Sequence, residues 1–373
     1  MVNIYYENLE NVDKTFAPYI ITALKEKKRL QLKVLQDIQT AYQKCYHNVA
    51  RHIRKKEKKR RLKVINSALE LVINKACGIL AMDIKNIIYL SIMEASFIAL
   101  SPLARIKLDL LIGMSKDGQK TRDKSLSKET SSSHSTPSIT GEAEEDDAHL
   151  ELLRSVQKDI LAEAKLIAKS TMEKISYFNE VEFKISTRIW DLSDGNKELI
   201  KNIIKEGINM NEASIAPLLE KYVKNGKDKL IKDYPNLKKR LGNRFTKDTT
   251  YNAYRLINNE IAKVFFNTTL NDYRQNEYVS AVKWLLSNNR TKKYEKDCNC
   301  SDYAYQNIYG LGNGIYPPKC VPERPHVLCQ CSLAPVSSRR LKNAMQKLEH
   351  IGNTPSEEWL VEARKIMQAE KKK

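Results

Sequence analysis

The sequence predicts a mainly α-helical protein with a small Cys/His-rich α+β subdomain towards its C-terminal end. Long stretches with almost no glycine or proline carry apolar residues at helical spacing, as in Leu30, Val34 and Ile38. In contrast, five of the seven cysteines fall between Cys298 and Cys331, in a segment rich in glycine and proline. Such a segment favours loops held around a metal over a long helix or sheet.

Residues 1–114 are predicted to form a basic, helical N-terminal region. Within it, eight of the eleven residues from Arg51 to Arg61 are lysine or arginine. This density suits contact with the phosphates of double-stranded DNA without sequence preference, and a solvated helix face is the alternative. The candidate phosphate-binding residues are Arg54, Lys55, Lys56, Lys58, Lys59, Arg60 and Arg61.

Residues 115–148 are predicted to be a disordered, low-complexity linker, because serine, threonine and charged residues offer little apolar surface to bury. The linker ends in an acidic run, 142–147, which is a second possible partner for the basic run. Helical spacing resumes at His149, so residues 149–290 are predicted to form a helical domain. Its expected elements are helices over 149–168, 196–206, 211–223 and 249–275, followed by a short strand over 279–286.

Residues 291–336 are predicted to form the Cys/His subdomain, and two helices over 339–351 and 355–369 are expected in the final segment, 337–373. The isolated Cys45 and Cys77 lie in helical sequence and are expected to be buried like small apolar residues. Trp190 and Trp284 are expected to anchor the core, and stacking on nucleic-acid bases is the alternative.

The formal net charge of +19 and the pI of about 9.4 favour polyanionic partners, above all nucleic acid. The first ten residues lack the pattern of a secretory signal. The most apolar stretch, 84–114, is interrupted by five charged residues and Pro102, so no membrane-spanning helix is predicted.

Six residues are candidate metal ligands: Cys298, Cys300, Cys320, His326, Cys329 and Cys331. Two of the cysteine pairs have one residue between them, and in extended chain such residues face the same side, so both members can bind one ion. Four thiolate or imidazole ligands complete a structural zinc site. Reduced thiols, or a disulfide formed after release from the cell, are the alternatives. A catalytic zinc ion would need a general base, and neither Asp302 nor Glu323 is marked as one, so no enzymatic activity is predicted.

The order of several further motifs resembles the phage head morphogenesis family, the Mu F-like minor head proteins. The matching motifs are Thr187-Arg188-Ile189-Trp190, Leu256-Ile257-Asn258-Asn259-Glu260-Ile261-Ala262, Val282-Lys283-Trp284-Leu285-Leu286, Cys298 with Cys300, Gly314-Ile315-Tyr316-Pro317-Pro318, and His326-Val327-Leu328-Cys329-Gln330-Cys331. The likeness covers roughly 185–335. It departs from the family where the first cysteines are one residue apart instead of two, where Val327 stands in place of proline, and where Cys320 is additional.

The resemblance implies a structural component of the virion, present near the portal in few copies. Such a protein would assist head assembly and DNA packaging or delivery, first in the host cytoplasm and then inside the capsid, with the portal and other capsid proteins as partners and no membrane. Two alternatives belong to other classes: a zinc-stabilised nucleic-acid-binding protein with a regulatory role, and an enzyme or toxin effector fused to a head-protein domain.

Overall fold

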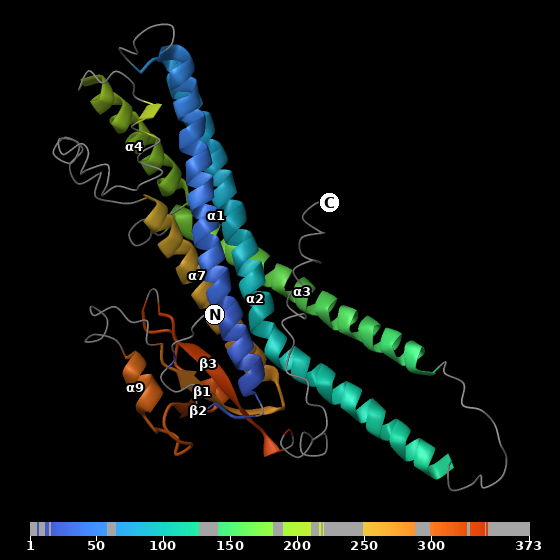
Figure 1. The fold of residues 1–373 in the computed structure, drawn as a ribbon. Coiled ribbons are helices and arrows are strands. Elements are labelled where there is room, and N and C mark those ends of the chain that lie inside the picture. The colour runs from blue at the N-terminus through green and yellow to red at the C-terminus, as the bar shows by residue number, and fades with distance from the viewer. Residues whose placement is uncertain are drawn as a thin grey trace. The chain divides into compact units, whose positions relative to one another are not determined.

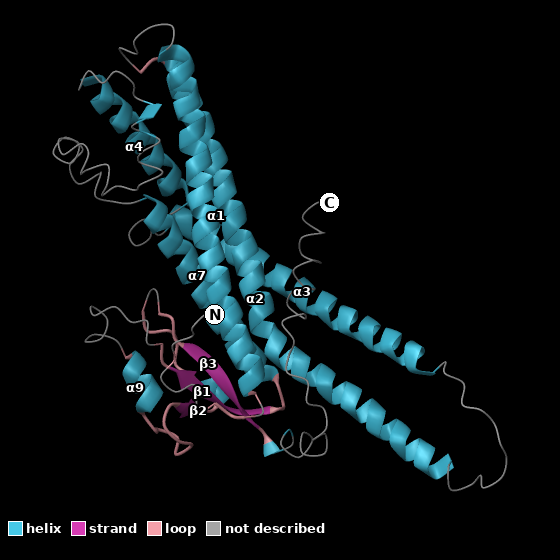
Figure 2. Cartoon of the chain, in the orientation of Figure 1, coloured by secondary structure: helices cyan, strands magenta, loops and turns pink. Residues whose placement is uncertain are grey.

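The structure is a computed structural model that describes residues 6, 12–14, 16–57, 65–126, 141–181, 189–209, 216–217, 219, 249–287, 299–326, 329–339 and 341. These residues are mainly helical, with one small antiparallel sheet towards the C-terminal end (Figure 2). The fold class expected from the sequence is therefore confirmed.

The elements follow one another from long helices to short strands (Figure 1). The helices are α1 Ala17–Glu57, α2 Ser67–Leu126, α3 Gly141–Val181, α4 Ile189–Asn209, α7 Thr249–Gln275 and the short α9 Cys300–Tyr305. The strands are β1 Val279–Leu285, β2 Ile315–Tyr316 and β3 Ser332–Ser337, and η2 Pro318–Cys320 is a 3-10 turn.

Comparison with the expected elements gives both agreement and corrections. Helix α7 and strand β1 lie where the sequence predicted them. The linker expected over 115–148 is wrong at both ends, because α2 continues to Leu126 and α3 already begins at Gly141. Straight-chain polar residues such as lysine and glutamate are good helix formers, so low apolar content did not stop these helices.

Several other predicted helices can be compared with the structure only in part, because some of their residues lie outside the described ones. The helix predicted over 196–206 is the central part of the longer α4. The segment 127–140, most of the helix predicted over 211–223, and nearly all of the two C-terminal helices lie outside the described residues.

The chain groups into two compact units that are built from alternating segments. Unit 1 combines Met1–Arg29, Met93–Lys169 and Ile261–Lys373, and unit 2 combines Leu30–Ile92 and Ser170–Glu260. Each of α1, α2, α3 and α7 contributes residues to both units. The units therefore do not coincide with the consecutive ranges expected from the sequence.

In unit 2, three helices meet around a buried polar group. The amide nitrogen of Asn196 on α4 donates to the sulfur of Cys45 on α1 at 3.6 Å and to that of Cys77 on α2 at 3.5 Å. The oxygen of the same amide accepts from the Tyr46 hydroxyl at 2.7 Å. Both cysteines are buried, as expected. They are hydrogen-bonded as well, since a fully buried amide has to satisfy its donors.

Helix α2 is the most apolar element. Its first turn is capped by Asn66, whose side-chain oxygen accepts from the backbone nitrogen of Leu69 at 3.0 Å. Among the described residues, the stretch Ser67–Leu111 is long and apolar enough to cross a membrane by length and composition, but 78% of its most apolar window is buried inside the protein. The core helix of a folded protein has the same composition, so this is weak evidence for a membrane span.

The sheet belongs to unit 1 and has the strand order β2-β1-β3, with both pairs antiparallel. Its centre is Trp284 on β1, which is fully buried. The Trp284 ring packs edge-on against Phe266 of α7, with centroids 5.4 Å apart, and against Tyr303 of α9, with centroids 5.2 Å apart. One aromatic side chain thus fixes a long helix, the sheet and the short helix together, as expected for a core anchor.

Candidate metal centre

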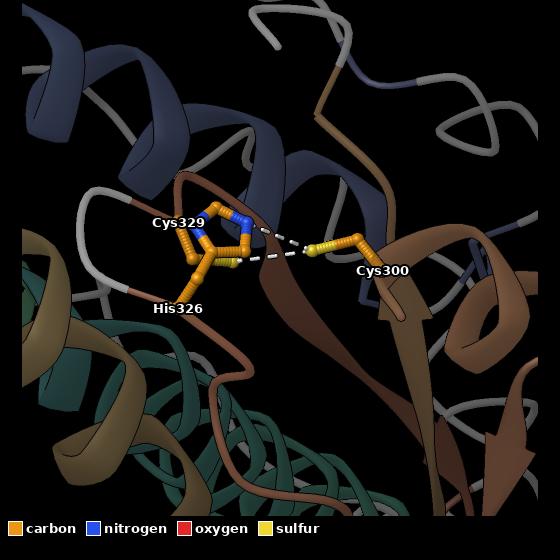
Figure 3. Close-up of side chains that lie close together, drawn as sticks. All are labelled: Cys300, His326 and Cys329. Carbon is orange, nitrogen blue, oxygen red and sulfur yellow. Dashed lines mark hydrogen bonds between the residues drawn. The ribbon is translucent and has the colours of Figure 1, made fainter. Parts of the chain in front are cut away.

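Three of the predicted ligands converge in unit 1: Cys300, His326 and Cys329 (Figure 3). The sulfur of Cys300 lies 3.4 Å from Nε2 of His326 and 3.6 Å from the sulfur of Cys329. Both cysteines are buried, and all three ligand atoms lie within 4.8 Å of one another. Such a group could hold a metal ion.

The spacing of these atoms fits a tetrahedral ion. With metal–sulfur bonds of about 2.3 Å and metal–nitrogen bonds of about 2.0 Å, tetrahedral ligands lie about 3.8 Å apart between sulfurs and about 3.6 Å apart between sulfur and nitrogen. The distances in this chain match both values to within a few tenths of an ångström. Two of the three spacings within the group therefore suit a tetrahedral ion.

Cys300 is held in place by the glycine-rich turn after α9. The backbone nitrogen of Gly314 donates to the oxygen of Gln306 at 2.8 Å, and the oxygen of Gly314 accepts from the nitrogen of Trp284 at 2.8 Å. A Cβ atom on Gly314 would lie 2.3 Å from the backbone oxygen of Ala304. The turn therefore needs glycine at this position to lie against α9 and join it to β1.

The other two ligands come from the loop before β3. The backbone nitrogen of Cys329 donates to the oxygen of His326 at 3.3 Å, which places their side chains on one turn. The Arg324 guanidinium donates to the oxygen of Cys329 at 2.6 Å and holds this turn in place. Hence α9 supplies one ligand from one side and this turn supplies two from the other, as Figure 3 shows.

The pKa values of the thiols of Cys300, Cys329 and Cys331 are shifted in different directions. Hydrogen bonds from Cys300 and Cys331 lower the pKa of Cys329 below its usual value. The hydrogen bond with Cys329 raises the pKa of Cys300 in turn. For Cys331, the hydrogen bond with Cys300 lowers the pKa, but the one with Cys329 and burial outweigh it and raise the pKa to about 12. A metal ion would displace these shared protons.

The remaining candidate ligands have different surroundings. Cys331 is buried, and it affects the pKa values of both Cys300 and Cys329 without being one of the three grouped ligands. Cys320 is exposed on η2 and lies outside the group. Cys298 lies outside the described residues.

Tyr6 and Lys27 interact electrostatically with the thiols of Cys329 and Cys331, and neither was expected from the sequence. Burial raises the pKa of Tyr6, and the thiols of Cys331 and Cys329 raise it further. The Tyr6 hydroxyl donates to the backbone oxygen of Gln330 at 3.3 Å. Burial also lowers the pKa of Lys27 on α1 to about 8, with a smaller contribution from Arg324, while the same two thiols raise it. A signal for Lys27 was present, because it lies at helical spacing between the apolar positions 20, 23, 24, 30 and 34.

The predicted phosphate-binding run lies at the end of α1 in unit 2. Arg54 and Lys55 are exposed there, and Lys56 belongs to the last turn of the helix. Lys58, Lys59, Arg60 and Arg61 lie outside the described residues. Exposed Lys44 and Arg51 precede Lys55 by eleven and four positions, so the three lie on one face of the helix.

Comparison of this chain with models of protein families, with curated proteins and with solved structures gives no match.

Proposed function

We propose that this protein is a phage minor head protein, a structural component that acts beside the portal in head assembly and in DNA packaging or delivery, and that zinc stabilises its C-terminal subdomain. The observation that carries the proposal is the group of Cys300, His326 and Cys329. Cys300 belongs to the fourth of the six motifs that resemble the Mu F-like minor head proteins, and His326 and Cys329 belong to the last. The motifs around Trp284 and Gly314 supply the strand and the turn beside the group.

Zinc is the ion that the ligand set favours, because thiolate and imidazole ligands at tetrahedral spacing suit it. Cys331, which is buried and affects the pKa values of both cysteines of the group, is the described candidate for the fourth ligand, and Cys298 is the alternative. Either choice gives three cysteines and one histidine. Four protein ligands leave no open position for a substrate, so the role of the ion is structural.

The proposal includes no enzymatic activity. A catalytic ion would need a general base within hydrogen-bond reach of its bound water. The nearest acidic residues in the described sequence around the group, Asp302 and Glu323, are both exposed. Their exposure favours a solvated role over one at the metal.

Metal analysis of the purified full-length protein tests the zinc site. Cys329→Ser should lose bound zinc, whereas the matched control Cys320→Ser should keep it, because the exposed Cys320 lies outside the group. Parent protein without zinc, or equal zinc content in both variants, would contradict this assignment.

Association with a portal protein tests the wider function. The full-length chain, co-expressed with the portal protein encoded nearest to its gene, should co-purify with it. A zinc-loaded chain that binds DNA but no portal protein would instead support the regulatory nucleic-acid-binding alternative.

Double-stranded DNA is the proposed polyanionic partner, bound without sequence preference. The support is the net charge of +19 and the exposed basic face that Lys44, Arg51 and Lys55 form on α1. Replacing Lys55, Lys56, Lys58 and Lys59 with Gln should flatten the dependence of affinity on salt without creating a base preference, because fewer counterions are released. DNA binding unchanged in this variant, with portal association lost, would assign the run to a protein contact instead.

A further inference from the structure

Helix α2 carries apolar residues on two opposite faces within unit 2. Leu69, Ile73 and Leu80 lie on the face that is buried inside the protein. Leu71 and Met82 lie on the other side of the helix, which has about 3.6 residues per turn, and they are 69% and 67% exposed. A helix that is apolar all round is normally covered on all sides, so an exposed apolar face of this kind is typical of an interaction site.

The exposed face runs along about three turns of α2, with residues three and four positions apart. Besides Leu71 and Met82 it contains Lys75, Gly78 and Ile79, all of them exposed. A Cβ atom on Gly78 would meet no heavy atom within 4 Å, so the helix surface is open at this point. The face therefore combines three large apolar side chains with a gap and a lysine.

This face is complementary to a second copy of itself. In an antiparallel pair of α2 helices centred between Gly78 and Ile79, Ile79 of each copy lies over Gly78 of the other and fills the gap there. Lys75 precedes this centre by about as many residues as Asp83, which is half-buried beside the face, follows it. Each lysine therefore comes level with the aspartate of the other copy. A two-fold axis forms every such contact twice.

We propose that this face of α2 is a homodimer interface, in which two copies of the chain pair antiparallel through Leu71, Gly78, Ile79 and Met82. A second copy is the occupant that fits, because one face supplies both the apolar side chain and the gap, and both signs of charge. A single helix pair over about three turns buries less surface than a standard interface, so the dimer should dissociate in about the micromolar range. The inference does not depend on the metal centre, which belongs to unit 1.

Sedimentation equilibrium of the full-length protein measures the dimer dissociation constant, with a reducing agent present so that the exposed Cys320 cannot cross-link copies. The parent should dimerise reversibly. Leu71→Gln and Met82→Gln should each raise the dissociation constant by at least about tenfold, because each lost apolar contact occurs twice. The matched control is Leu166→Gln on α3, which is also 69% exposed but belongs to unit 1 and should dimerise like the parent.

A charge exchange tests the antiparallel pairing. Lys75→Asp and Asp83→Lys should each weaken dimerisation, because each brings like charges together, whereas the double variant should recover the parent dissociation constant. Urea midpoints of all these variants, measured where the parent is monomeric as well, should match that of the parent, so that the loss of the dimer is not a loss of the fold.

Three results would overturn the inference. The first is a parent that stays monomeric up to about 100 μM. The second is a dimer that Leu71→Gln and Met82→Gln leave unchanged, since that dimer uses another surface; if these variants also lose portal association, the face belongs to a portal contact. The third is a double charge variant that dimerises no better than the single ones.

Discussion

Gly314 gives the sharpest test of how the subdomain is built, because a second glycine of the same turn provides a matched control. Gly310 and Gly314 both have φ near +66°, in the left-handed region. A Cβ atom at position 310 would meet no heavy atom within 4 Å, whereas at position 314 it would lie 2.3 Å from the backbone oxygen of Ala304. Replacing each glycine with alanine therefore separates backbone strain from steric overlap.

The expected magnitudes follow from these contacts. The left-handed conformation costs an alanine about 1 kcal/mol, and this applies to both variants. In Gly314→Ala the turn must also move away from α9 by roughly 1 Å, because Cβ atoms essentially never approach a backbone oxygen so closely. That shift weakens the two hydrogen bonds of Gly314, to Gln306 and from Trp284, each worth about 1 kcal/mol. We expect losses of about 3 kcal/mol for Gly314→Ala and about 1 kcal/mol for Gly310→Ala.

Urea unfolding followed by tryptophan fluorescence measures this difference. Trp284 is one of three tryptophans and is fully buried in the folded sheet, so its emission changes when unfolding exposes it to water. Gly314→Ala should also bind zinc more weakly, because α9 carries Cys300. Equal stabilities for the two variants would refute the argument, since the overlap at position 314 would then have no energetic consequence.

Two further predictions concern buried polar groups. Burial raises the pKa of Asp272 to about 7; Lys107 opposes this shift and Glu163 adds to it. The folded protein therefore holds the carboxyl proton more tightly than the unfolded chain does. Its free energy of unfolding should consequently fall as the pH rises from about 4 to 7. Asp272→Asn should therefore raise the melting temperature more at pH 8 than at pH 4, by the equivalent of about 1–2 kcal/mol, and a pH-independent effect would contradict this. Asn196→Ala should cost about 2 kcal/mol in urea unfolding, because it removes the acceptor of the Tyr46 hydroxyl. In a Tyr46→Phe background the same change should cost clearly less, and strict additivity of the two losses would show that the pair is not coupled.

The sequence predicted those features that depend on local pattern. Helical spacing located α7, and the alternation of β-branched and aromatic residues located β1. The clustering of soft ligands identified Cys300, His326 and Cys329, which the fold brings together. Each of these signals is contained within a few tens of residues.

Features that depend on distant parts of the chain were not predictable in the same way. The sequence offered both Cys320 and Cys331 as candidate metal ligands. In the structure Cys320 is exposed on η2, whereas Cys331 is buried. The buried position of Lys27 on α1 depends on packing against Phe265 of α7, 238 positions later in the chain. The ends of α2 and α3 were missed for another reason: a polar segment can continue a helix by propensity alone, without an apolar face to reveal it.

The contacts between the first residues and the last strand affect the order in which the protein can fold. Asp13 accepts from the backbone nitrogen of Ser337 at 3.0 Å and also from its hydroxyl, and Tyr6 forms a bridge with Ser287. During synthesis these partners leave the ribosome 281 and 324 residues later, at roughly 5–20 residues per second, so the N-terminal segment emerges many seconds before its binding surface exists. Unit 1 can therefore close only after β3 has been made, whereas every segment of unit 2 has by then been synthesised. Ribosome-bound chains that stop before β3 should accordingly leave the N-terminal segment open to proteases.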